Sequence, residues 1–251
     1  MATRSDPLAH TRRLVRREAG RRARPAVLVL IGLAALALAL VLGVGLGSVS
    51  VAPGDTVAIL AHRLLGLDVA RTWSDATETI VMDLRLPRVL TAMVVGVGLA
   101  VAGAAFQGLL RNPLADPYVL GTASGAALGA AIAVLIPVRI VVLQFGLLHG
   151  LAFAGALIAV YTVYRLSQTG GLSPLTSLLL TGYAVGSLLA AGLAMAMYLS
   201  GTALGQIFSF LLGGFDGSSW VRLAGAAPIV LGGAVAIGLR ARSINGLLLG
   251  E

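Results

Sequence analysis

Two arginines three positions apart are the feature of the sequence most suited to recognition chemistry. Arg85 and Arg88 flank Leu86-Pro87. A spacing of three places both guanidinium groups on one side of a helical turn, and proline suits the first turn of a helix. Guanidinium forks match the geometry of carboxylates, so the pair can dock acidic groups of a partner protein. Position alone favours a simpler interpretation, in which both are ordinary arginines at a membrane interface.

A polar turn follows about twenty residues later. It contains Gln107 and the run Arg111-Asn112-Pro113-Leu114-Ala115-Asp116-Pro117. Two prolines prevent a continuous helix through this segment, and Asn112 and Asp116 can cap the backbone groups that the break leaves open. We expect a structural turn here rather than direct contact with a substrate.

Several kinds of chemistry are excluded by composition. The chain has no Cys and no Lys, and His10, His62 and His149 lack the spacing of metal ligands. A phosphate-binding loop of the GxxxxGK[ST] type needs a lysine, and thiolate chemistry needs a cysteine. We therefore predict a chain that is not an enzyme, holds no metal or cofactor, and depends on a separate subunit for any ATP hydrolysis.

The elements that position these residues are membrane helices. The chain has 251 residues, of which 58% are hydrophobic and only 11% charged, whereas about a quarter of the residues in soluble proteins are charged. A bilayer core takes about 20 helical residues. The apolar runs are rich in Ala, Leu and Gly and lack the alternation of barrel strands. The sequence predicts an all-α, polytopic membrane helical bundle.

Six spans are predicted, with an Arg-rich tail (residues 1–25) before the transmembrane domain (26–251). The spans are Ala26–Leu46, Val89–Leu109, Val119–Ile136, Phe145–Leu166, Leu175–Leu199 and Leu223–Leu239. Eight arginines precede Pro25, and such an excess of positive charge places the N-terminus in the cytoplasm. An arm for nucleic acid and a cleaved signal peptide are the less favoured interpretations of this tail.

The longest predicted loop, Gly47–Leu86, lies outside in this orientation. Within it, PGDTVAILAHRLLG indicates a short interfacial helix with Asp55 as its N-cap and Gly66 as its end. The acidic residues of the loop are expected to be mostly solvated.

Small residues recur at four-residue spacing on two spans, which predicts close packing of helix backbones. The positions are Gly121, Gly125 and Gly129 on the third span and Gly182 and Gly186 on the fifth. No ionisable residue lies in the middle third of any span, which disfavours proton coupling. The fifth span instead carries hydroxyls, among them Ser177, Thr181, Tyr183 and Ser187, as suits a path for a bulky ligand.

The segments RLPR (85–88), NPLADP (112–117) and GTASGAALG (121–129) closely resemble the signature of the FecCD-type ABC importer permeases, which move iron–siderophores, haem and cobalamin. The resemblance implies a type II importer fold with six of the usual ten spans present. It assigns Arg85 and Arg88 to docking of acidic residues on a solute-binding protein. It also assigns Leu175 and Thr176, with Thr181 and Tyr183, to the translocation path. Leu249, Gly250 and Glu251 match the start of the segment that couples to the ATPase.

The same resemblance implies the partners. These are a second permease subunit, two cytoplasmic ATPases that hold ATP and Mg²⁺, an extracytoplasmic solute-binding lipoprotein, and the lipid of a bacterial cytoplasmic membrane. Iron–siderophore is the expected cargo by frequency in the family, with cobalamin and haem as alternatives. Because the family pattern continues beyond Glu251, we expect a truncated permease, a naturally short form being the alternative. A six-span secondary transporter or channel, and more weakly an intramembrane enzyme, remain the other classes.

Overall fold

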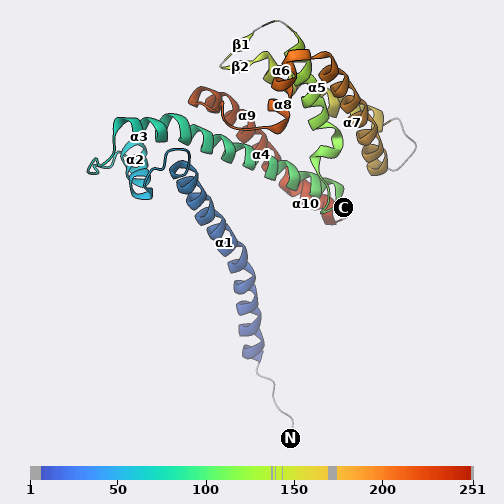
Figure 1. Cartoon of the computed structure of the whole chain (residues 1–251). Helices are drawn as coiled ribbons and strands as arrows, with labels where there is room; N and C mark the ends of the chain where they lie inside the picture. Colours follow the sequence, from blue (N-terminus) through green and yellow to red (C-terminus); the bar gives the residue numbers. More distant parts are fainter. Residues whose placement is uncertain (1–6, 137, 139, 143, 169–173, 250–251) are drawn as a thin grey trace. The chain divides into compact units, whose positions relative to one another are not determined.

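The computed structural model describes residues 7–136, 138, 140–142, 144–168 and 174–249, with the side chains of 7–25, 142, 174–175 and 247–249 left out. It is helical, as predicted. The helices are α1 (Pro7–Gly45), α2 (Pro53–Leu65), α3 (Asp75–Thr79), α4 (Leu86–Leu110), α5 (Thr122–Leu135), α6 (Leu147–Ser167), α7 (Pro174–Leu199), α8 (Leu204–Leu212), α9 (Trp220–Leu239) and α10 (Ala241–Leu249) (Figure 1). A π-helical turn, η1 (Ile80–Arg85), joins α3 to α4, and short 3₁₀ turns cover Pro117–Leu120 (η2) and Gly201–Ala203 (η3). Two-residue strands, β1 (Val141–Val142) and β2 (Phe145–Gly146), pair antiparallel.

Five stretches of helix among the described residues are long and apolar enough to cross a bilayer. They are Ala26–Gly45, Asp75–Leu110, Leu147–Ser167, Thr176–Leu199 and Trp220–Leu239. Each overlaps one of the predicted spans, so the sequence correctly located five apolar helices.

The third predicted span, Val119–Ile136, is different. Here the structure has α5, a helix of only 14 residues, which is about 21 Å long and shorter than a bilayer core. Asp116 and Pro117 begin the turn η2, and Gly121, with a φ of 70°, ends it in the left-handed region. The predicted apolar run is therefore divided at Gly121, and only its second part forms a helix, α5. This helix packs against other helices of the protein.

The second predicted span also begins earlier than expected. Pro87 does not open a helix, because α3, η1 and α4 form one continuous run from Asp75 to Leu110. Ser74 starts this run, since its Oγ accepts a hydrogen bond from the Thr77 N–H at 3.2 Å. The π-helical turn ends at Arg85, two positions before Pro87, and the Leu86 N–H is bonded to the Val81 carbonyl. A proline has no N–H to donate to the helix. The wider π-helical turn accommodates this missing hydrogen bond, so the helix continues through Pro87.

The chain forms two compact units, one ending at Val89 and one starting at Leu90. In the first, α2 packs beside the C-terminal end of α1 and the π-helical turn, and Val44, Ile59 and Val81 are fully buried. Gly66 ends α2 in the left-handed region, as predicted. Asp55 is not the N-cap, because Ala52 holds that position and Pro53 opens the helix. Its carboxylate instead accepts a hydrogen bond from Thr72 Oγ1 at 2.8 Å.

In the second unit, α5 is the central helix and packs against α6, α7 and α8 (Figure 1). Glycines permit the closest approaches. A Cβ on Gly125 would overlap the carbonyl oxygen of Gly155, and one on Gly129 would overlap that of Leu151. Gly182 on α7 lies equally close to the carbonyl of Val119. Gly121 and Gly186 face each other, since a Cβ on either would lie 3.3 or 3.6 Å from the Cα of the other. Backbone contact of this kind supplies dispersion energy where lipid gives no hydrophobic gain.

This packing generates a prediction about Gly125. Gly125→Ala should lower the free energy of unfolding of the chain in detergent micelles by about 1–3 kcal/mol, and so lower its melting temperature. The added methyl group overlaps backbone atoms, and no side-chain rotation can relieve this overlap. Gly103→Ala is the matched control, since a Cβ at Gly103 has nothing within 4 Å. Equal melting temperatures for the two variants would contradict the close contact of α5 with α6.

Candidate functional site

The two arginines of the RLPR segment lie in different surroundings. Arg85 is half-buried and Arg88 is exposed. The Nη1 group of Arg85 donates to the carbonyls of Val44 at 3.0 Å and Gly45 at 2.8 Å, and Nη2 donates to the carbonyl of Val49. The two members of the predicted docking pair therefore differ in exposure, and Arg85 also binds backbone oxygens.

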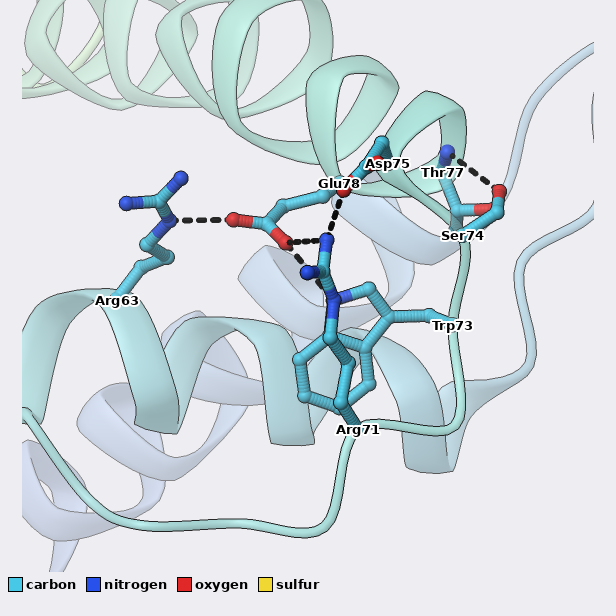
Figure 2. Close-up of polar contacts among 7 residues, drawn as sticks. All are labelled: Arg63, Arg71, Trp73, Ser74, Asp75, Thr77 and Glu78. Atoms are coloured by element: carbon cyan, nitrogen blue, oxygen red, sulfur yellow. Dashed lines mark hydrogen bonds and ion pairs between the residues drawn. The ribbon is translucent and has the colours of Figure 1, made fainter.

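An ionic cluster that the sequence did not predict lies between α2 and α3 (Figure 2). Its centre is Glu78, which is only 8% exposed. One carboxylate oxygen of Glu78 accepts from Trp73 Nε1 at 3.0 Å and from Arg71 Nη2 at 3.1 Å. The other accepts from Arg63 Nε. Arg71 also pairs with the exposed Asp75.

The expectation that the acidic residues of this loop are mostly solvated is thus wrong for Glu78. Its burial is compensated by charge-assisted hydrogen bonds, as a buried carboxylate requires. The cluster also lines an open polar hollow of about 630 Å³. One feature of the sequence could have indicated the position of Glu78. Ser74-Asp75 is a typical helix start, and it places Glu78 on the first turn, beside Trp73.

The polar turn after α4 is held by its own side chains. Arg111 ends the helix in the left-handed region, with a φ of 49°. Gln107 Nε2 donates to the Pro113 carbonyl at 3.0 Å. Asn112 accepts from the Leu114 N–H at 2.9 Å and Asp116 from the Tyr118 N–H at 2.8 Å. These bonds satisfy the backbone groups left open by the two prolines, and the turn borders a largely apolar hollow of about 620 Å³.

The hydroxyl-bearing side chains of α7 differ in how far they are buried. Ser177 was expected in the path, but it is buried and donates to the Ser167 carbonyl at 2.7 Å, which ties α7 to the end of α6. Tyr183 is 78% exposed, Thr181 is half-buried and Thr176 is exposed. The Leu175 side chain lies outside the described residues.

Tyr183 and Ser187 line a hollow of about 290 Å³ between α7 and the start of α5. Tyr118 and Ser124, which sequence reasoning missed, line the same hollow. Four residues with hydroxyl groups thus border one small space, together with Gly121, Gly182 and Gly186. Such a surface can offer hydrogen bonds to a polar ligand without any fixed charge.

Of the predicted coupling residues, Leu249 is the last residue of α10, and Gly250 and Glu251 lie outside the described residues. Within the described ranges, no three His, Cys, Asp or Glu side chains are grouped closely enough to hold a metal ion. After α8, Gly213 and Gly214 both have positive φ. Ser219 then caps α9 through the Arg222 N–H.

Long apolar helices and close glycine contacts indicate a multi-pass membrane protein. Residues 21–251 match the model of the FecCD transport family, and the chain belongs to that family. Its members are transport subunits rather than enzymes, as the sequence predicted.

Relatives of the chain are permeases that are named for different compounds. The chain is 35% identical over 199 residues to the cobalamin import system permease BtuC of Halobacterium salinarum, covering 79% of this chain and 51% of the relative. It is 36% identical over 200 residues to the hemin transport system permease HmuU of Yersinia pestis, covering 74% and 58%. It is 33% identical over 170 residues to the Fe(3+)-citrate import system permease YfmE of Bacillus subtilis, covering 67% and 47%.

A solved structure of an inward-facing ABC transporter of metal-chelate type is also similar. It aligns with a TM-score of 0.61 and 29% identity, covering 78% of this chain and 56% of the solved one. The chain therefore spans about half the length of the relatives that it matches.

The Glu78 cluster generates a prediction. Glu78→Gln removes the negative charge that pairs with both Arg63 and Arg71. It should lower the free energy of unfolding by about 1 kcal/mol, because both arginines are open to solvent. Amide exchange across residues 53–85 should then be roughly fivefold faster in the full chain. Asp68→Asn is the control, because Asp68 is exposed, lies in the same segment and is not one of the residues of the cluster. Equal exchange in the two variants would show that the cluster does not hold this segment together.

Proposed function

We propose that the chain is the membrane subunit of a binding-protein-dependent ABC importer for a metal chelate. The observation that carries the proposal is the family match over residues 21–251, which includes the RLPR, NPLADP and glycine-rich segments. The similarity to an ABC transporter of metal-chelate type supports the same class. Two ATPase subunits supply the energy, because the chain has no lysine for a phosphate-binding loop.

The subunit performs no covalent chemistry in this proposal. Two permease subunits, alike or different, enclose the path, and nucleotide hydrolysis on the ATPases moves them between states open to either side. The hydroxyl-lined hollow between α7 and the start of α5 belongs to the path wall. Its Tyr183, Ser187, Tyr118 and Ser124 give weak, uncharged contacts, which suit a ligand that must be released after each cycle.

The proposed cargo is an iron–siderophore. Named relatives act on cobalamin, hemin and Fe(3+)-citrate, which are all metal complexes of organic ligands. Cobalamin and haem are therefore the alternatives.

The proposed location is a bacterial cytoplasmic membrane with the N-terminus inside. The eight arginines before Pro25 support this orientation. It places Arg88 on the outer side, where a solute-binding protein docks. Arg88 is the exposed member of the pair, so its guanidinium is the group that we assign to carboxylates on that protein.

Transport in vesicles tests the class. The chain, reconstituted with its ATPase and binding protein, should accumulate a ferric hydroxamate chelate only when ATP is present, while cobalamin and hemin serve as competing probes. Omitting the ATPase should abolish uptake. Uptake by the chain alone, driven by a proton or Na⁺ gradient, would instead identify a secondary transporter.

A second prediction concerns Arg88. Arg88→Glu should weaken docking of the binding protein roughly tenfold at low salt, because it replaces an attractive charge by a repulsive one at the contact. Membrane insertion should not change. Arg242→Glu is the matched control, since it changes the net charge equally from an exposed position at the predicted inner end. Docking that is equally strong in both variants would remove Arg88 from the contact.

A further inference from the structure

The C-terminal end of α1 needs partners for its backbone. The last carbonyls of any helix have no donor within the helix, and unpaired carbonyls are costly in buried surroundings. α1 ends at Gly45, and both Val44 and Gly45 are buried. The donors come from a residue about forty positions later, because Arg85 Nη1 bonds to both of these carbonyls.

The same guanidinium also holds the chain that leaves α1. Its Nη2 donates to the Val49 carbonyl, so one planar group binds three backbone oxygens across residues 44–49. A guanidinium has five donors in a rigid fork, which allows this pattern. A positive charge at the C-terminal end of a helix is also favoured by the helix dipole.

Two features keep Arg85 in this position. It is the last residue of the π-helical turn η1, and Leu86 and Pro87 directly after it are fully buried. On the other side lies Gly47. A Cβ at Gly47 would be 2.6 Å from Nη2 and 2.9 Å from Cζ of Arg85, so a side chain at position 47 would require the guanidinium to shift.

We infer that Arg85 is a positioning residue that caps α1 and orders residues 46–51. The role of Arg85 does not depend on the cargo or on the proposed function. Three backbone acceptors at nearly fixed positions require the planar fork, so a lysine at position 85 should replace it only in part.

The test uses the absence of cysteine from the chain. A spin label at Ser48→Cys, an exposed position, reports the order of the segment by its mobility in the full chain in lipid nanodiscs. Arg85→Gln should make the label mobile and Arg85→Lys should have an intermediate effect. Arg88→Gln should leave it unchanged. Exchange of the Val51 amide, which bonds to the Gly45 carbonyl, should be roughly fivefold faster in Arg85→Gln.

A second pair of variants protects the test if Arg85→Gln does not fold. Gly47→Ala retains Arg85 but displaces its guanidinium, and should also raise the mobility of the label. Gly54→Ala is the control, since a Cβ there has nothing within 4 Å. An immobile label in both Arg85→Gln and Gly47→Ala, or an equal change in Arg88→Gln, would overturn the inference. Neither measurement requires a transport partner, so its failure is distinct from failure of the proposed function.

Discussion

Satisfying the backbone at helix ends is the constraint on which the rest of this structure depends. The first N–H groups and the last carbonyls of a helix have no partner within the helix, so each helix end needs donors or acceptors from elsewhere. The chain supplies such partners from its own side chains. Arg85 binds the carbonyls at the end of α1, Ser74 starts the helical run at Asp75, and Asn112 and Asp116 hold the turn after α4. Polar residues are few in this chain, and many of those it has are used in this way.

Between the ends, the helices are joined by backbone contact rather than by charge. Gly125 and Gly155 bring α5 and α6 together so closely that neither position has room for a methyl group. The same device brings Gly121 and Gly186 together beside a hollow that is also lined by hydroxyl-bearing residues. The packing of the helices and the shape of this hollow therefore depend on the same small residues.

Much of the fold followed from the sequence, because apolar length and composition are local properties. The helical class, five of the spans and the short helix α2 could be recognised in this way, and the family could be recognised from its motifs. The start of the second helix could not, since Pro87 resembles a first-turn proline and only the π-helical turn before it reveals a continuous run. The roles of Arg85 and Glu78 were also missed, because their partners lie on other segments. Val44 is 41 residues from Arg85, and Arg63 is 15 from Glu78.

The π-helical turn has a consequence for how this region can change. One extra residue is accommodated between Ile80 and Arg85, and in an ordinary α-helix each residue advances the direction by about 100°. Deleting a single residue there would rewind the turn and swing everything before it around the axis of α4. The carboxylate of Glu78 and the guanidinium of Arg85 would no longer reach their separate targets together. The π-helical turn thus fixes the rotation of Glu78 relative to Arg85 about the helix axis. Insertions or deletions would therefore be tolerated far less in this turn than in the loop that precedes α3.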